Sequence, residues 1–105
     1  GLPHHTHHDI ARRQMDGYGG MLSFSLHGDF QDVKKLVPNL THAHAAASLG
    51  SVTTLIGPPA VTSHVELTAE ERRALGIPES LIRYSAGVEN LDDLIEDLKL
   101  GLASL

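Results

Sequence analysis

The most informative stretch of this chain is Ser80-Leu81-Ile82-Arg83-Tyr84-Ser85-Ala86-Gly87-Val88-Glu89, an apolar run with a single arginine in its middle. Its composition favours a strand, in which alternate side chains point to opposite faces, so Arg83 shares a face with Leu81 and Ser85. The guanidinium keeps its charge at any ordinary pH, and its burial without an anionic partner is unfavourable. Two roles therefore stay open for Arg83, a surface or structural arginine, or one that binds a carboxylate or phosphate through its planar fork.

The composition is that of one ordinary domain with an aliphatic core. Of the 105 residues, 41% are hydrophobic and only 4% are aromatic,. Eight basic against thirteen acidic residues give a formal charge of -5, which argues against nucleic acid and anionic membranes as partners. No apolar run approaches the roughly 20 residues of a membrane span, and there is no cysteine. We therefore expect a cytoplasmic protein without disulfides.

Apolar spacing and turn residues predict the remaining elements. Besides the arginine strand, strands are expected over residues 21–27, 40–47 and 52–56, and helices over residues 7–15, 30–37, 69–75 and 91–105,. Asp29, Thr68 and Asn90 are the expected caps of the last three helices. The order of the elements predicts an α+β fold, with a mainly antiparallel sheet of about four strands and helices packed against it.

The last helix has an apolar stripe opposite an acidic face. The stripe consists of Leu91, Leu94, Ile95, Leu98, Leu102 and Leu105. The acidic face consists of Asp92, Asp93, Glu96 and Asp97. Because most of these acids lie in the first half of the helix, where the helix dipole favours them, we interpret them as a solvated face and not as a site.

The first nine residues hold five potential metal ligands, namely His4, His5, His7, His8 and Asp9. Imidazoles bind zinc, copper or nickel, but a site needs ligands that converge from a fixed scaffold, and neighbouring histidines do not guarantee this. We therefore favour a plain polar start to the first helix over a physiological or adventitious metal site.

A serine–histidine nucleophile formed by Ser48 and His64 is disfavoured for a similar reason. Neither serine of the run Ser48-Leu49-Gly50-Ser51 has a base beside it in sequence, and there is no G-x-S-x-G elbow,. We expect these serines to act as hydrogen-bonding groups.

Five runs of residues together point to a family. They are Gly1-Leu2-Pro3-x-His5-x-x-His8-x-x-Ala11-x-Arg13-Gln14-Met15, Gly19-Gly20-Met21-Leu22-Ser23-Phe24, Ser48-Leu49-Gly50, Pro59-Ala60-x-x-Ser63-His64, and Leu81-Ile82-Arg83-x-Ser85-x-Gly87-Val88-Glu89-x-x-x-Asp93-Leu94-Ile95. In the same order, they resemble the C-terminal portion of the pyridoxal-phosphate trans-sulfuration enzymes. These include methionine γ-lyases, cystathionine γ-lyases, γ-synthases and β-lyases, and homoserine-ester sulfhydrylases. The resemblance covers essentially the whole chain.

The resemblance implies that residues 1–105 are one domain, the small C-terminal domain of a fold-type I pyridoxal-phosphate enzyme. In this family an upstream large domain carries the Schiff-base lysine and holds the cofactor, and the small domain closes the site from one side. The family's substrate-carboxylate arginine matches Arg83, and its accompanying serine matches Ser48. We accordingly assign Arg83, Ser48, Leu49 and Ala47 to substrate binding, and no catalytic, cofactor-binding or metal-binding residue to this chain.

The departures from the family pattern bear on the substrate. Members that handle cystathionine commonly place a glutamate where Ala47 stands here, and an alanine offers no partner to a distal ammonium. The resemblance therefore favours an enzyme like a methionine γ-lyase or a sulfhydrylase, which cleaves or forms a C–S bond in a sulfur-containing or O-acylated amino acid. Of the four opening histidines, His4 and His7 are extra, and the other two match a structural motif.

We expect the chain alone to be inactive, because its lysines, Lys34, Lys35 and Lys99, all fall on polar faces of helices,. Its partners would be the missing large domain and further copies of itself, since the family forms homotetramers. The alternative is a non-catalytic interaction or oligomerisation module derived from that domain, in which the surfaces that once met the large domain bind a partner.

Overall fold

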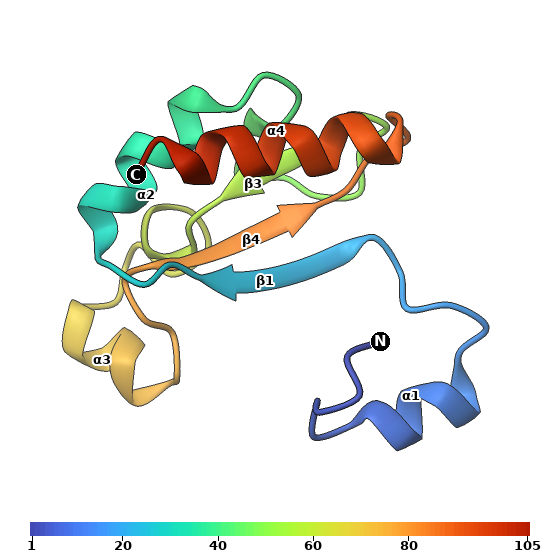
Figure 1. Cartoon of the computed structure of the whole chain (residues 1–105). Helices are drawn as coiled ribbons and strands as arrows, with labels where there is room; N and C mark the ends of the chain where they lie inside the picture. Colours follow the sequence, from blue (N-terminus) through green and yellow to red (C-terminus); the bar gives the residue numbers. More distant parts are fainter.

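The computed structural model describes residues 1–105 as a four-stranded sheet with two helices across one face (Figure 1). The strands are β1 (Met21–Ser25), β2 (His44–Ala45), β3 (Leu55–Gly57) and β4 (Leu81–Ser85). The helices are α1 (His8–Gln14), α2 (Phe30–Leu36), α3 (Ala69–Ala74) and α4 (Leu91–Ala103), with 3-10 turns η1 (Val37–Asn39) and η2 (Pro59–Val61). Every expected element is present, but β2 and β3 are shorter than expected.

The sheet is mixed, so the expectation of a mainly antiparallel sheet is wrong. Its strand order is β1-β4-β3-β2. The central strand β4 is antiparallel to β1 and to β3, whereas β2 and β3 are parallel. The reason is the connection of residues 46–54, which is not a tight hairpin but carries the chain back so that β3 runs in the same direction as β2.

The core lies between the sheet and the helices α2 and α4 (Figure 1). Its buried residues are Val33, Leu36, Ala43, Ile56, Ile82 and Tyr84. The alternation in β4 follows the prediction, since Ile82 and Tyr84 are buried against the helices and Arg83 points to the opposite face, where it is half-buried. The arginine thus lies on the face that α2 and α4 leave uncovered.

Helix α4 packs through a narrower stripe than the leucine pattern predicts. Leu94 and Gly101 are buried, whereas Leu91 is 69% exposed and several later leucines are also exposed. A Cβ added to Gly101 would lie 2.6 Å from a methyl group of Leu40. The glycine therefore lets α4 approach the chain next to η1 closely, and most of the predicted apolar stripe remains at the surface.

Asp97 contradicts the interpretation of the acidic residues of α4 as a solvated face. It is only 6% exposed, and its carboxylate accepts hydrogen bonds from the backbone N–H groups of Thr41 (2.6 Å), His42 (3.0 Å) and Ala43 (3.3 Å). Burial by itself raises the pKa of this carboxyl, but the three donors outweigh it and hold the pKa below its ordinary value,. Asp97 thus fixes the chain just before β2.

The segment before β1 lies on the other side of the sheet from α2 and α4 (Figure 1). Its helix α1 buries no residue.

The chain is less compact than a typical domain of its length. Its Cα radius of gyration is 14.4 Å, against about 13 Å for a compact domain of this length. The exposed surface is 7064 Å², whereas a compact monomer of this mass would expose about 5,700 Å². None of the helices is long and apolar enough to cross a membrane.

Candidate substrate-carboxylate site

Arg83 is held against the loop that follows β2. Its Nη2 group donates to the carbonyl oxygens of Ala47 (2.7 Å) and Ser48 (2.8 Å). In the sheet Arg83 is registered with Gly57 of β3, where an added Cβ would lie 2.7 Å from the carbonyl oxygen of Ala46. A glycine at this position therefore allows the loop to lie close to the sheet and within reach of the guanidinium.

Arg83 has no acidic partner within the chain, unlike Arg72. The guanidinium of Arg72 is buried, pairs with Glu79 at 2.8 Å, and also donates to the carbonyl oxygens of His64 and Leu67. The hydrogen bond to Glu79 holds the pKa of Arg72 above its ordinary value. Arg83 instead uses Nη2 on two neutral carbonyl groups, which leaves the N–H groups of Nε and Nη1 without a partner in the chain,. Its positive charge is therefore available to an anion.

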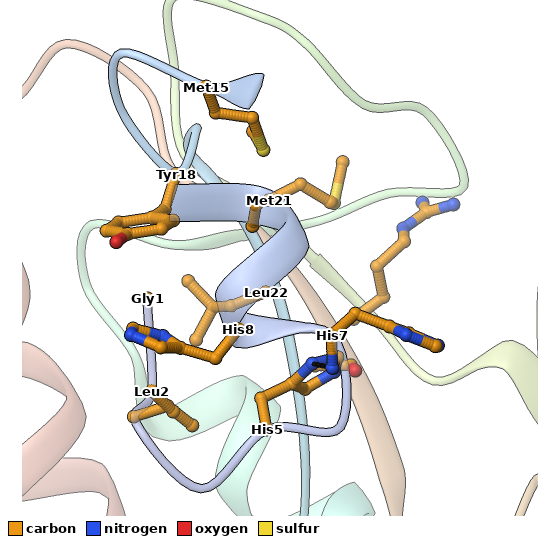
Figure 2. Close-up of a pocket in the computed structure, with 12 residues that line it drawn as sticks. Gly1, Leu2, His5, His7, His8, Met15, Tyr18, Met21 and Leu22 are labelled. Atoms are coloured by element: carbon orange, nitrogen blue, oxygen red, sulfur yellow. Dashed lines mark hydrogen bonds between the residues drawn. The ribbon is translucent and has the colours of Figure 1, made fainter. Parts of the chain in front are cut away.

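A pocket of about 520 Å³ lies between the opening segment and β1, and Arg83 forms part of its lining. Figure 2 shows His8 and Tyr18 on the side of the opening segment, with Met21 and Leu22 of β1 opposite them. The rings of His8 and Tyr18 stack with centroids 6.1 Å apart. The histidine-rich opening thus lies in the same pocket as Arg83, a proximity that the sequence did not predict.

The other predicted substrate-binding residues lie on the loop of residues 46–53 (the 46–53 loop). Ala47 and Ser48 meet Arg83 through their backbone carbonyl groups, and the side chains of both are exposed. Leu49 is 55% exposed and is not among the residues that line the pocket. The turn after it is fixed by a hydrogen bond from Gly50 N–H to Ser85 Oγ (2.9 Å). The structure thus brings Arg83 together with Ala47 and Ser48, but not with Leu49.

Ser48 and His64 do not form a nucleophile pair through any hydrogen bond of the structure. The Nδ1 atom of His64 is bonded to Ser63 Oγ at 2.9 Å, and the only hydrogen bond of Ser48 to a side chain uses its carbonyl oxygen. The hydroxyl of Ser48 makes no hydrogen bond within the chain, so its expected role as a hydrogen-bonding group stays a prediction. No group of three or more His, Asp or Glu side chains is placed to hold a metal ion.

Sequence reasoning missed Glu89 as a part of this region. Its carboxylate accepts hydrogen bonds from Thr54 N–H (2.6 Å) and Thr54 Oγ1–H (2.8 Å), at the end of the 46–53 loop. The N–H of Thr54 holds the pKa of Glu89 below its ordinary value. The sequence did place Glu89 at the end of the stretch that contains Arg83. It could not show that Glu89 binds Thr54, because the two residues are distant in sequence and only the fold brings them together.

None of the three lysines suits a Schiff base with pyridoxal phosphate. Lys35 pairs with Asp32 at 3.0 Å and Lys99 lies 3.8 Å from Glu96, with side chains that are 59% and 68% exposed. Lys34 lies over the ring of Phe30. No lysine lines the pocket beside Arg83. Such a lysine needs a desolvated site, so the residues of this chain do not by themselves fit the covalent attachment of the cofactor.

The chain matches a family model and many known proteins along its whole length. Residues 1–103 match the model of the Cys/Met metabolism PLP-dependent enzymes. The chain is 46% identical to an L-methionine gamma-lyase of Fusobacterium nucleatum subsp. polymorphum over 105 residues, which are 100% of this chain and 27% of that protein. It is 48% identical to a cystathionine beta-lyase of Lactococcus lactis subsp. cremoris over 102 residues, or 97% of this chain and 27% of that protein.

Solved structures agree with the sequence matches. A crystal structure of cystathionine gamma synthase from Xanthomonas oryzae pv. oryzae, in complex with cystathionine, superposes with a TM-score of 0.90 at 43% identity. The match covers 99% of this chain and 27% of that one. The chain thus spans about a quarter of the length of the relatives that it matches, and it belongs to the family of Cys/Met metabolism PLP-dependent enzymes.

Proposed function

We propose that the chain is the C-terminal, substrate-carboxylate-binding domain of a pyridoxal-phosphate-dependent lyase or transferase that cleaves or forms C–S bonds in sulfur amino acids. One observation carries this proposal. Arg83 lies on the uncovered face of the sheet, lines a pocket and has no acidic partner in the chain. A half-buried guanidinium with free donors is suited to a carboxylate, because charge-assisted hydrogen bonds are stronger than neutral ones.

In this proposal Arg83 binds the α-carboxylate of the amino-acid substrate. The carbonyl groups of Ala47 and Ser48 hold one end of the guanidinium, so that its remaining N–H groups point in a fixed direction,. Ser48 Oγ is exposed and has no partner in the chain, so it is free to donate to the same carboxylate or to a bridging water,. Leu49 would contact the substrate from the exposed turn of the loop.

The exposed alanine at position 47 supports one class of substrate. Its side chain is exposed beside the carbonyl group that holds Arg83, and a methyl group offers nothing to a distal ammonium. We therefore favour a substrate without such a group, a sulfur-containing or O-acylated amino acid, as in a methionine γ-lyase or a sulfhydrylase. The relatives by name include both a methionine lyase and a cystathionine lyase, so Ala47 is what supports this choice.

The rest of the complete protein would supply the cofactor site. The lysines of this chain are unsuited to a Schiff base, and its surface exceeds that of a compact monomer of its mass,. Both observations support a large domain that carries pyridoxal phosphate and covers the Arg83 face. We expect the complete protein to be a cytoplasmic homo-oligomer, as is usual in this family.

The test compares a substrate that has an α-carboxylate with one that lacks it. In the complete protein, Arg83→Ala should lower kcat/KM for the amino acid much more than for its α-carboxamide, because the carboxamide has no charge for Arg83 to bind. The matched control is Arg73→Ala, which removes an exposed arginine of α3 outside the pocket. An equal decrease in kcat/KM for both substrates would show that Arg83 does not bind the α-carboxylate.

The large excess of surface also supports a second function, that of a stand-alone interaction or oligomerisation module. Exposed apolar residues continue from the opening segment to the strand β1, including Leu2, Met15, Met21 and Leu22. Large exposed apolar patches mark interaction surfaces. A start codon at the position of Gly1 would favour the module, and a lysine-bearing domain encoded upstream in the same reading frame would favour the enzyme.

A further inference from the structure

The 46–53 loop, which carries the proposed substrate contacts, is tied to the rest of the fold at both ends. Before it, Asp97 binds the backbone of residues 41–43. In its middle, Arg83 and Ser85 hold the carbonyl groups of Ala47 and Ser48 and the N–H of residue 50. At its far end the loop is held at Thr54, which is hydrogen-bonded to the carboxylate of Glu89.

Glu89 binds both donors of Thr54. Oε1 accepts from Thr54 N–H at 2.6 Å and Oε2 accepts from Thr54 Oγ1–H at 2.8 Å. The hydroxyl in turn accepts from Gly87 N–H at 2.9 Å, and the side chain of Thr54 is fully buried. In addition Val88 N–H donates to the Val52 carbonyl oxygen at 2.9 Å. The end of the 46–53 loop is thereby joined to the stretch that follows β4.

The approach of the two segments is too close for any side chain at Gly87. A Cβ at this position would overlap the carbonyl oxygen of Val52 and would also collide with the carboxylate of Glu89. The glycine thus allows the backbone of residues 52–54 to lie directly against residues 87–89. One continuous stretch, β4 and the residues after it, therefore holds the loop in two places, through Arg83 and Ser85 in its middle and through Val88 and Glu89 at its end.

We propose that Glu89 is a positioning residue for the substrate site: its carboxylate fixes Thr54, and Thr54 fixes the end of the 46–53 loop against Arg83. The inference rests on the proposed function of Arg83. Because the carboxylate makes two charge-assisted hydrogen bonds to Thr54, it restricts both the orientation of Thr54 and its distance from Glu89. With the loop fixed at Thr54, the carbonyl groups of Ala47 and Ser48 keep the guanidinium in one orientation.

The chain provides a matched control in Glu71. The carboxylate of Glu71 likewise binds one threonine, accepting from Thr68 N–H (2.8 Å) and Thr68 Oγ1–H (2.8 Å), but at the start of α3. Glu71 therefore accepts from the same two groups of a threonine as Glu89 does, without any connection to the 46–53 loop. Thr68 and Glu71 are exposed, whereas Thr54 is fully buried, so Glu71→Ala controls for the loss of a carboxylate that binds a threonine.

The first measurement is amide hydrogen exchange of the complete protein. In Glu89→Ala we expect exchange of peptides covering residues 46–54 to rise by roughly tenfold or more, the factor that matches the loss of one hydrogen bond to a charged group. Exchange in α4 should not change. Glu89→Gln keeps one acceptor oxygen and should give a smaller rise, and Glu71→Ala should leave the loop as it is. Unchanged exchange of the loop in folded Glu89→Ala would overturn the inference.

The second measurement is the kinetics of the same variants. We expect Glu89→Ala to raise KM for the amino-acid substrate more than it lowers kcat, with partial rescue by Glu89→Gln and no effect of Glu71→Ala. Suppose that Glu89→Ala speeds amide exchange in the loop but leaves KM unchanged, while Arg83→Ala has its expected effect. Glu89 then has no positioning role and the inference is wrong. If Arg83→Ala has no effect either, the proposed function fails, and the exchange data still decide whether Glu89 holds the loop.

Thr54→Val serves if Glu89→Ala does not fold. It keeps the shape of the buried side chain and the Thr54 N–H bond to Glu89, but it removes the hydroxyl that joins Glu89 to Gly87. We expect faster exchange in the same loop peptides and a raised KM, both smaller than in Glu89→Ala. A Thr54→Val protein with normal exchange of the loop and a normal KM would overturn the inference.

Discussion

The Nη2 atom of Arg83 lies 2.8 Å from the carbonyl oxygen of Ser48. Two of the four residues assigned to substrate binding from the family resemblance are thus in direct contact, although 34 residues of chain separate them. The contact uses the backbone of Ser48, so its hydroxyl remains free. The hydroxyl of Ser48 and the three N–H groups on Nε and Nη1 of Arg83 therefore have no hydrogen-bond partner within the chain,.

The first prediction concerns the relative weight of these two residues in the complete enzyme. Arg83→Ala should lower kcat/KM by a factor that corresponds to about 2 to 4 kcal/mol, because it removes a charge-assisted contact. Arg83→Lys should restore only part of this, since an ammonium lacks the planar fork. Ser48→Ala should cost only about 1 kcal/mol, because water can replace a neutral hydroxyl. Steady-state kinetics measure all three, and a larger loss in Ser48→Ala than in Arg83→Ala would reverse the assignment.

The second prediction compares Arg83, for which we propose a binding role, with Arg72, which is buried and paired with Glu79. Arg72→Ala should lower Tm more than Arg83→Ala, because it leaves Glu79 and the carbonyl groups of His64 and Leu67 without their donor,. Arg83→Ala releases only two carbonyl groups of an exposed loop, which water can solvate. Thermal unfolding followed by circular dichroism checks the order. If Arg83→Ala unfolds the protein and Arg72→Ala does not, Arg83 is structural.

The third prediction concerns the buried carboxylate of Asp97. Asp97→Asn should lower the free energy of unfolding by about 2 to 3 kcal/mol, since an amide presents one oxygen to three N–H donors and has no charge,. Denaturant unfolding at neutral pH measures the loss. Asp93→Asn is the matched control on the exposed face of the same helix. An equal effect of the two substitutions would mean that the three hydrogen bonds contribute nothing.

The same carboxylate gives a prediction for pH. The pKa of Asp97 is lowered in the folded state, so its contribution is complete above the ordinary aspartate pKa of about 4. As the pH falls below that value, the unfolded chain takes up the proton first and the free energy of unfolding decreases until the folded carboxyl is protonated as well. Asp97→Asn should therefore unfold with a weaker dependence on pH below about 4. An unchanged acid profile would contradict this.

The fifth prediction concerns the 105-residue chain by itself. It should self-associate or unfold easily, because its surface of 7064 Å² exceeds that of a compact monomer, about 5,700 Å². It should also give no Schiff-base absorbance with pyridoxal phosphate, since all three of its lysines are exposed and none lies in a desolvated site,. Sedimentation and absorbance spectroscopy test the two parts. A monodisperse monomer with a high Tm, or an absorbance that is lost when one of the lysines is replaced, would refute the respective part.

The local sequence correctly predicted where the helices begin and which side chains of the central strand β4 share a face. Thr68 caps α3 and Asn90 caps α4 as expected, and Thr68 forms a capping box with Glu71. Gly76, just after the end of α3, has a φ of +76°. These features depend on hydrogen bonds and backbone angles within a few residues. The alternation that buries Ile82 and leaves Arg83 on the other face is likewise a property of one strand,.

The motifs and apolar patterns that indicate the family and a sheet of about four strands lie in short runs, so both could be predicted from the sequence, whereas the residues of the candidate site stay a prediction. Three features depend instead on the folded chain: the parallel pairing of β2 with β3, the burial of Asp97 and the hydrogen bonds between Glu89 and Thr54. Each of these contacts joins residues about 10 to 60 positions apart, and no local propensity encodes such a pairing. The role of a charged side chain is therefore decided by the backbone groups that the fold brings to it, as the contrast between Asp97 and the exposed Asp93 on the same helix shows.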